Sequence, residues 1–182
     1  MTPRQPDPRK LDAAAFAADA GVLEGHWPLA DFSRLGDGSI QDGDVQWSVR
    51  GERRLVAGGE PEIWLHLAAR ARVGLDCQRC LQSVSWDLDV VRPLRFVAGE
   101  DAAAALDAKG EDDVLALSRS LDLHDLIEDE LLLALPLVPM HAQCPQRLPM
   151  SAGDQGGPAV AQDPNPFAAL AALKRARDGG GD

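Results

Sequence analysis

The sequence lacks the marks of several large classes of protein. Its 182 residues contain no uninterrupted apolar run near the roughly 18 residues that a membrane-spanning helix needs. The N-terminal stretch MTPRQPDPRK is polar and rich in proline, and no apolar segment typical of a secretory signal follows it. The three cysteines are an odd number and do not indicate a disulfide framework. We therefore expect a cytoplasmic protein without a membrane partner.

Familiar catalytic motifs are also missing. The sequence has no glycine-rich phosphate-binding loop and no nucleophile elbow. The acids of residues 122–130 could serve a hydrolase or nuclease that uses a divalent metal, but helical spacing places several of them on a solvent-exposed face. We therefore predict that the protein is not an enzyme and keep the metal-dependent hydrolase as the weaker alternative.

Negative charge is in excess and is unevenly distributed. The chain has 29 acidic and 18 basic residues, a net charge of −11, and 45% hydrophobic residues, which is enough for a core. Residues 99–130 hold eleven acids against Lys109 and Arg119, a balance of −9. Such a stretch is either a solvated surface or a patch that faces a basic partner. Because this charge repels phosphates, we do not expect broad wrapping of nucleic acid.

Alternating apolar residues predict an antiparallel sheet. Apolar residues occupy every odd position from Ile63 to Leu75, which is the pattern of one long, half-buried strand. Alternation resumes from Val84 to Val90, so these two runs can form a hairpin with the cysteine pair at its tip. Further strands are expected at 45–49, 94–97 and 114–117.

Helices are predicted in three places. The first is the alanine-rich stretch 11–20, which could form a short helix before the turn-rich residues 21–44. Asp122 is a candidate N-cap for an acidic amphipathic helix that Pro136 terminates. Asn165 begins a short C-terminal helix, which would be marginal alone and is expected to dock.

The predicted fold class is α+β: an antiparallel sheet with a long hairpin, one acidic amphipathic helix and a short docked C-terminal helix. The expected parts are a flexible tail (1–10), a single α+β domain (11–150) that contains an acidic connection (99–113), a linker (151–163), and the C-terminal helix and tail (164–182).

The cysteines carry the most specific chemistry. Cys77 and Cys80 have the spacing of a metal-binding or redox pair, and His141 precedes Cys144 by the same spacing. Together these four residues could form a Cys3His zinc site that joins the hairpin tip to the loop after the acidic helix. Two alternatives stay open: thiols without a metal, and a thioredoxin-like redox pair. The second alternative fits less well, because such redox motifs open a helix after a strand.

Arginines near the hairpin define a second candidate site. Arg70 and Arg72 lie on the polar face of the long strand, and Arg79 lies between the cysteines. Trp64 falls on the same polar face, which predicts an exposed contact residue. These side chains could form a small RNA-binding face, with packing in the sheet as the alternative.

Four stretches of the sequence resemble the YceD family, described as the large ribosomal RNA subunit accumulation protein. Their order and spacing match the family over residues 45–175. They are LDCQRCLQSV (75–84), DLHDLIEDELLLALPLVPMH (122–141), the loop that ends at Cys144, and PNPFAALAALKR (164–175).

The resemblance implies a non-enzymatic factor in the synthesis, processing or accumulation of large-subunit ribosomal RNA, and a role in ribosome assembly. Combined with the charge pattern, it favours an acidic surface that binds a basic ribosomal or ribosomal-RNA-processing protein. A zinc- or thiol-based structural or redox module without a ribosomal role is the alternative function. The acids predicted to bind the partner are Asp125, Glu128, Asp129 and Glu130.

Overall fold

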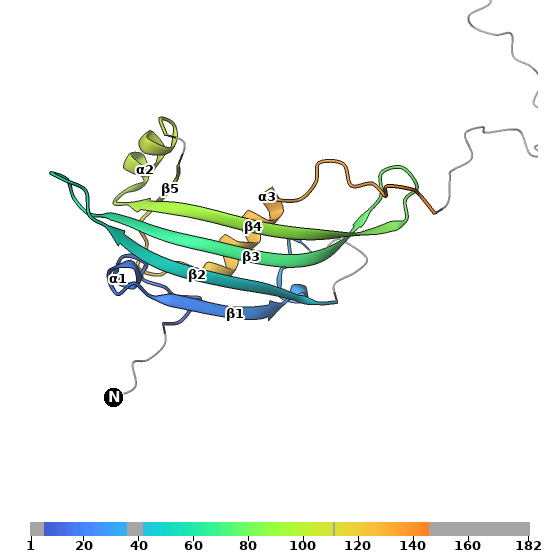
Figure 1. Cartoon of the computed structure of the whole chain (residues 1–182), viewed down its shortest axis with the longest axis horizontal. Coiled ribbons are helices and arrows are strands. Elements are labelled where there is room, and N and C mark those ends of the chain that lie inside the picture. Colours follow the sequence, from blue (N-terminus) through green and yellow to red (C-terminus); the bar gives the residue numbers. More distant parts are fainter. Residues whose placement is uncertain (1–5, 36–41, 111, 146–182) are drawn as a thin grey trace, which may run out of the picture. The chain divides into compact units, whose positions relative to one another are not determined.

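A five-stranded sheet forms the centre of the structure, a computed structural model that describes residues 6–35, 42–110 and 112–145 (Figure 1). The strands lie side by side in sequence order, and each neighbouring pair is antiparallel except the last, which is parallel. The strands are β1 (Val22–Pro28), β2 (Asp44–Arg54), β3 (Glu62–Asp76), β4 (Ser83–Val97) and β5 (Asp113–Ala116), and the helices are α1 (Ala13–Ala18), the short 3-10 helix η1 (Leu29–Asp31), α2 (Glu100–Asp107) and α3 (Leu123–Leu133).

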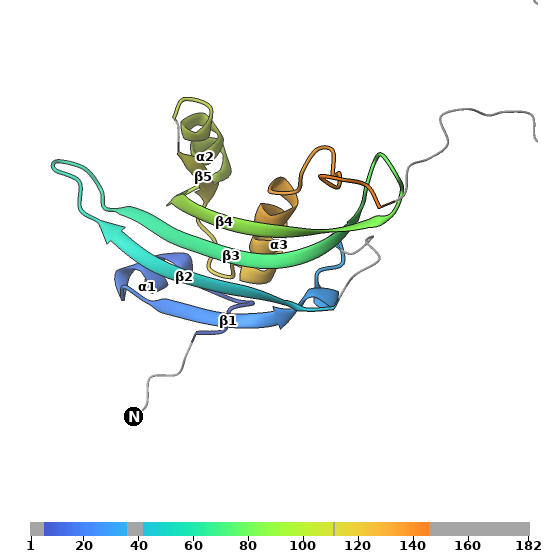
Figure 2. The ribbon, with the colours of Figure 1, turned by 45° about the vertical axis from the view of Figure 1, so that its right-hand side comes forward.

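The longest hairpin pairs β3 with β4 over nearly their whole length. Ile63 lies opposite Phe96 at one end, and Asp76 lies opposite Ser83 at the other. The odd-numbered side chains of β3 point into the core, so the apolar alternation has its expected structural meaning. The predicted hairpin, with the cysteine segment at its tip, is confirmed (Figure 2).

Helices α1 and α3 contribute to a core that covers one face of the sheet. Along α3, Leu123, Ile127 and Leu131 recur every four residues and are completely buried. Helix α1 approaches β2 so closely that a Cβ at Gly51 would lie 2.8 Å from the Cα of Ala17. The sheet residues of the core include Val45, Val49, Leu65, Leu67, Leu88, Val90 and Leu94.

The limits of α3 follow from its sequence. The side chain of Asp122 accepts hydrogen bonds from the N–H groups of His124 (2.9 Å) and Asp125 (3.4 Å), as an N-cap does. The helix ends at Leu133, ahead of Pro136, which cannot continue it. The predicted acidic helix and the α+β class are therefore confirmed.

Strand β1 was not predicted, because it lies in the turn-rich stretch 21–44. Only Leu23 and Trp27 face the core, with Gly25 between them, so its apolar alternation is weak. Gly25 lies opposite Trp47 and, having no side chain, leaves room for its indole. Trp27 stacks on Trp47 with ring centroids 4.4 Å apart, which holds the strand at the edge of the sheet.

The expected acidic connection, 99–113, contains helix α2, which the sequence analysis did not predict. Ala103 is the buried residue of this helix. The Asp107 carboxylate accepts a hydrogen bond from the N–H of Val114 (3.1 Å), which fixes the turn from α2 into β5. The acids at the start of α2 are favourably placed for its dipole.

The prediction that Trp64 is exposed is wrong. Trp64 is 4% exposed, although it lies on the face of β3 opposite the core. Its indole N–H donates to the Glu62 carboxylate (2.9 Å), and the guanidinium of Arg54 lies 4.6 Å from the ring centroid. These polar neighbours cover the ring, and sequence alternation alone does not reveal them.

Two expected parts, the linker and the C-terminal helix that begins at Asn165, lie outside the described residues. Residues 6–10 of the expected tail are described, and the carbonyl of Pro8 accepts a hydrogen bond from the N–H of Leu123 (2.9 Å). Within the described ranges, none of the helices is both long enough and apolar enough to cross a membrane.

Candidate functional site

The two hairpin cysteines lie in a tight turn between β3 and β4. Cys77 follows β3 directly, and its N–H donates to the carbonyl of Gln82 (2.9 Å). The N–H of Leu81 donates to the carbonyl of Cys77 (2.8 Å), which closes the turn. The side chains of Cys77 and Cys80 are both buried, so the turn directs both thiols inward.

The second pair of residues arrives on the loop that follows α3. The loop returns to the hairpin tip, where the N–H of Gln78 donates to the carbonyl of Pro139 (2.9 Å). In Figures 1 and 2 the orange loop lies beside the green hairpin tip. This contact brings His141 and Cys144 to the hairpin cysteines, which lie more than sixty residues earlier in the chain.

The four predicted ligands meet in one cluster, the Cys3His group: Cys77, Cys80, His141 and Cys144. Their ligand atoms all lie within 4.8 Å of one another. The Sγ atoms of Cys77 and Cys144 are 3.9 Å apart, and Sγ of Cys80 is 3.5 Å from Nδ1 of His141. Tetrahedral zinc, with Zn–S near 2.3 Å and Zn–N near 2.0–2.1 Å, requires separations of about 3.8 Å and about 3.6 Å. The group can therefore bind a metal ion with little rearrangement.

The imidazole of His141 is oriented as a metal ligand would be. Its Nε2 lies 3.1 Å from the carbonyl oxygen of Ser83. In the tautomer with its N–H at Nε2, the ring donates to that carbonyl, and the lone pair of Nδ1 faces Cys80. Three thiols with one imidazole suit zinc better than magnesium or calcium, which prefer oxygen ligands.

The environment also favours the thiolate that a metal requires. Burial raises the pKa of the Cys77 thiol, but the backbone N–H groups of His141, Arg79 and Cys80 turn toward the sulfur and bring its pKa down to about 5. For Cys144, burial and the adjacent thiols of Cys80 and Cys77 raise the pKa to about 11. A bound cation would displace that proton, so metal binding should weaken at acid pH.

A thioredoxin-like role is not supported by this geometry. Cys77 and Cys80 lie in a turn between two antiparallel strands, whereas a thioredoxin-like pair opens a helix. All three cysteines are free thiols. The cysteines are thus arranged as ligands around a common centre rather than as an isolated redox pair.

The acids of α3 divide into a buried and an exposed pair. Glu128 is 4% exposed and accepts hydrogen bonds from Arg34, at the backbone N–H (2.7 Å) and at Nε (2.8 Å). Glu130 is also buried and accepts one from Nε of Arg92 (3.2 Å). Asp125 and Asp129 are exposed, and Asp129 also contacts Arg34. No local sequence pattern predicts that Arg34 and Arg92 are the partners, because both lie far from α3 in the chain.

The pKa values of the two buried carboxylates, Glu128 and Glu130, are shifted in opposite directions. Burial raises the pKa of Glu128, but the N–H and guanidinium of Arg34 outweigh it, so the pKa lies below its usual range. Burial raises the pKa of Glu130, and Arg92 offsets this only in part.

Both the Cys3His group and α3 fall within a stretch that matches a known family. The family model described as large ribosomal RNA subunit accumulation protein YceD matches residues 65–174. The chain belongs to the YceD family. A relative from Haemophilus influenzae, named large ribosomal RNA subunit accumulation protein YceD, is 38% identical over 107 residues. That match covers 57% of this chain and 60% of the relative, and no solved structure matches the chain significantly.

The predicted RNA-contact arginines of this YceD-family chain do not all lie together. Arg70 and Arg72 project from the open face of β3, where they pair with Asp89 and Asp87 of β4. Arg79 lies at the hairpin tip instead, and its guanidinium is 3.6 Å from Sδ of Met140. Arg70 and Arg72 are therefore exposed on the open face, and each has a carboxylate partner.

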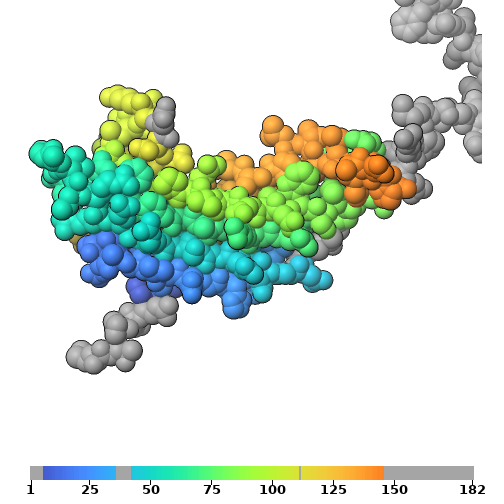
Figure 3. Space-filling view, viewed as in Figure 1, coloured from blue at the N-terminus to red at the C-terminus, as the bar shows by residue number. Residues whose placement is uncertain are grey.

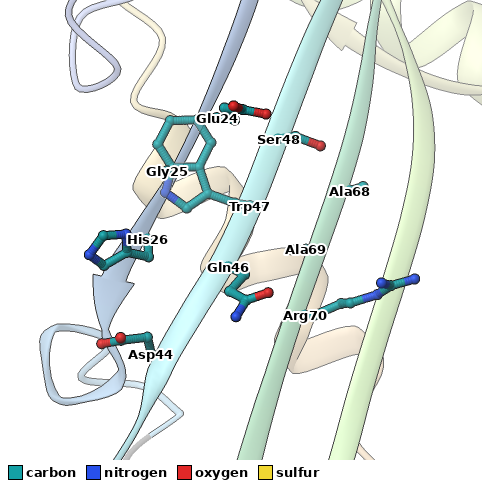
Figure 4. A pocket seen from close by; sticks show the side chains of 10 residues that line it. All are labelled: Glu24, Gly25, His26, Asp44, Gln46, Trp47, Ser48, Ala68, Ala69 and Arg70. Carbon is teal, nitrogen blue, oxygen red and sulfur yellow. The ribbon is translucent and has the colours of Figure 1, made fainter.

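A shallow groove crosses this open face over β1, β2 and β3 (Figure 4). Arg70 lies at one side of it, and His26, Glu24 and Asp44 lie toward β1. Charges of both signs therefore line the groove, which fits a polar ligand but weakens any attraction for phosphate.

His124 lies in a second group of possible ligands in this YceD-family chain, together with Asp125 and Glu128. Its ring is buried and stacks on Phe32, with centroids 4.1 Å apart, and neither ring nitrogen has a hydrogen-bond partner among the described residues. Because Arg34 already occupies the Glu128 carboxylate, its positive charge disfavours a cation there.

Proposed function

We propose that this chain supports the accumulation of large-subunit ribosomal RNA, the role that the name of its Haemophilus influenzae relative gives to that protein. The observation that carries the proposal is that the family match spans α3 and both arms of the Cys3His group. We propose a binding factor rather than an enzyme. Four protein ligands would complete a zinc coordination shell, whereas catalytic zinc keeps one position open for water or substrate.

We further propose that the Cys3His group holds zinc as a structural ion. The donor types, the tetrahedral spacing and the hydrogen bond from His141 to Ser83 support this assignment. Zinc bound there would tie the hairpin tip to the loop after α3. The stabilisation follows from closing a long stretch of chain at one point.

The proposed partner is a basic ribosomal or ribosomal-RNA-processing protein. The balance of −9 over residues 99–130 supports a basic partner, because opposite charges steer association. On α3 the proposed contact surface narrows to Asp125 and Asp129, since these two acids are exposed, whereas Glu128 and Glu130 are buried against arginines of the chain. Local RNA contact at Arg70 and Arg72, and a cytoplasmic location, remain part of the proposal.

A deletion strain tests the ribosomal role. We expect the ratio of large-subunit to small-subunit ribosomal RNA to fall, and the wild-type gene to restore it. The double variant Cys77→Ser, Cys80→Ser should fail to restore the ratio if the zinc centre is needed. A normal ribosomal RNA profile in the deletion strain would favour a zinc- or thiol-based module without a ribosomal role.

A further inference from the structure

The end of the molecule that carries the Cys3His group also exposes large apolar side chains. Leu137 is 100% exposed, and Leu133, at the end of α3, is 75% exposed. Exposed apolar residues that gather in one place mark interaction sites more often than scattered ones do. One set, called here the apolar surface, comes from the hairpin turn, the end of α3 and the loop that a hydrogen bond from Gln78 to Pro139 ties to that turn: Leu81, Leu133, Leu137, Val138 and Met140.

The backbone beneath the apolar surface is fixed by hydrogen bonds. The N–H of Gln78 donates to the carbonyl of Pro139, and the N–H of His141 donates to Sγ of Cys77 (3.4 Å). The loop that carries Leu137 is therefore anchored to the hairpin tip instead of moving freely. An anchored loop presents its apolar side chains to a partner at a low cost in conformational entropy.

Leu81 is the least expected residue of the apolar surface. Its φ is +59°, in the left-handed region that glycine and asparagine occupy more readily than leucine. Its side chain is 67% exposed, so packing within the chain does little to offset the backbone strain. A residue that is both strained and exposed points to a role in binding.

Charge selects the class of partner. Asp125, Asp129 and Leu133 follow one another at four-residue spacing along the exposed side of α3, so an acidic row leads to Leu133. Arg34 pairs with Asp129 and offsets part of its charge, whereas the carboxylate of Asp125 has no arginine or lysine partner among the described residues. These acids repel RNA phosphates and anionic lipid. A second copy of this chain, with its own net charge of −11, is disfavoured in the same way. A protein segment with basic and apolar side chains complements both the acids of α3 and the apolar surface.

We propose that the apolar surface, together with Asp125 and Asp129, docks a basic, apolar segment of a partner protein. The choice of a ribosomal protein as that partner rests on the proposed function. The surface itself is inferred from exposure, backbone anchoring and charge. Because the loop is anchored to the Cys3His group, docking should depend on the metal.

The test uses the full-length chain loaded with zinc and proteins extracted from purified large ribosomal subunits, freed of RNA. Each bound protein is identified and then titrated singly. We expect a basic protein to bind, and the double variant Leu137→Ser, Val138→Ser to weaken its binding by at least about tenfold. Leu81→Gly should also weaken binding, while the midpoint of thermal unfolding stays unchanged or rises, because glycine relieves the strain. Leu55→Ser is the matched control, since Leu55 is 79% exposed in the turn between β2 and the start of β3, away from the hairpin tip.

Several results would overturn the docking proposal. They include no binding by any large-subunit protein, full affinity in the double variant, and equal loss of affinity in Leu55→Ser. Self-association that the double variant abolishes would assign the surface to a second copy. Binding of protein-free RNA or anionic vesicles at the same residues would assign it to those ligands. A lower unfolding midpoint with unchanged partner affinity would show that the chain itself covers the surface.

The deletion strain separates this proposal from the proposed function. If the strain shows the ribosomal RNA defect and the variant Leu137→Ser, Val138→Ser restores the ratio fully, docking at the apolar surface is wrong and the proposed function stands. If the strain has a normal profile, the ribosomal function is wrong, whereas the measured affinities still decide whether the surface binds a protein.

Discussion

The two ends of β3 are stabilised by different means. At its beginning, the Glu62 carboxylate accepts the indole N–H of Trp64 and pairs with the guanidinium of Arg95 (2.9 Å), so side chains of the chain itself hold this end together. Beyond its end, three thiols and an imidazole converge on a common centre. The first end, called here the packed end, is held by contacts between side chains of the chain alone. The second end is called here the metal end, because an ion would complete it if the proposed zinc site is correct. The two ends should therefore respond to different perturbations.

The largest effect is expected at the metal end. Cys80→Ser removes one of four ligands, so zinc should fall from about one ion per chain to almost none. Amide hydrogen exchange should then accelerate in residues 77–83 and 137–145, because the hairpin tip and the loop lose their common anchor. Metal analysis and exchange measured by mass spectrometry check both expectations.

The matched control for the metal end is Arg79→Ser, which changes a side chain in the same turn that is not a ligand. It should keep the metal and the slow exchange. Equal zinc content in Cys80→Ser and wild type would contradict the assignment of the Cys3His group.

The packed end should lose stability without losing metal. Trp64→Ala removes a buried indole and should lower the free energy of unfolding by about 3–5 kcal/mol. Trp64→Phe keeps most of the ring but loses the bond to Glu62, so a cost of about 1 kcal/mol is expected. Urea unfolding measures both values. If Trp64→Ala also lost its zinc, the two ends would be coupled rather than separate.

The pH dependence of stability tests the packing of α3 against the loop that carries Arg34. Because the pKa of Glu128 is lowered in the folded chain, its stabilisation is present above its ordinary value of 4.5 and is lost as the pH falls through the lowered pKa. Glu128→Gln should therefore cost about 1–3 kcal/mol at neutral pH. The difference from wild type should vanish in acid, as urea unfolding at several pH values would show.

Glu130 supplies the opposite case on the same helix. Its pKa is raised, so its ionised form opposes folding, and this penalty disappears as the pH falls through the raised pKa. Wild type should therefore gain stability relative to Glu130→Gln on acidification. Parallel pH curves for the two glutamine variants would contradict the opposite shifts.

The smallest effect is expected on the open face of the sheet. Arg72 and Asp87 each have side chains that are 71% exposed. Exposed ion pairs contribute little, so Arg72→Gln should change the free energy of unfolding by less than about 0.5 kcal/mol. A larger loss in the free energy of unfolding would show that ion pairs on this face stabilise the fold as strongly as the contacts of the packed end.

Local patterns in the sequence predicted the hairpin, α3 and the Cys3His group. Period-two alternation determines which side of β3 is buried, and the spacing of each ligand pair sets its own geometry. The ion pair between Arg34 and Glu128 joins residues 94 positions apart, and no local pattern encodes that contact. Trp64 was misjudged for a related reason, since Arg54 and Glu62 cover it from the polar side.

The Cys3His group is split between two parts of the chain: Cys80 and His141, which face each other in it, are 61 residues apart. An unfolded chain holds these halves apart and offers zinc only two ligands at a time, so the complete site exists only in the folded form. If the group holds zinc as proposed, mass action links the amount of folded protein to free zinc, and a tenfold fall in saturating zinc should cost about 1.4 kcal/mol of stability. With the proposed site, a cell short of zinc would lose folded copies of this protein to proteolysis, and the abundance of the protein would follow the metal supply.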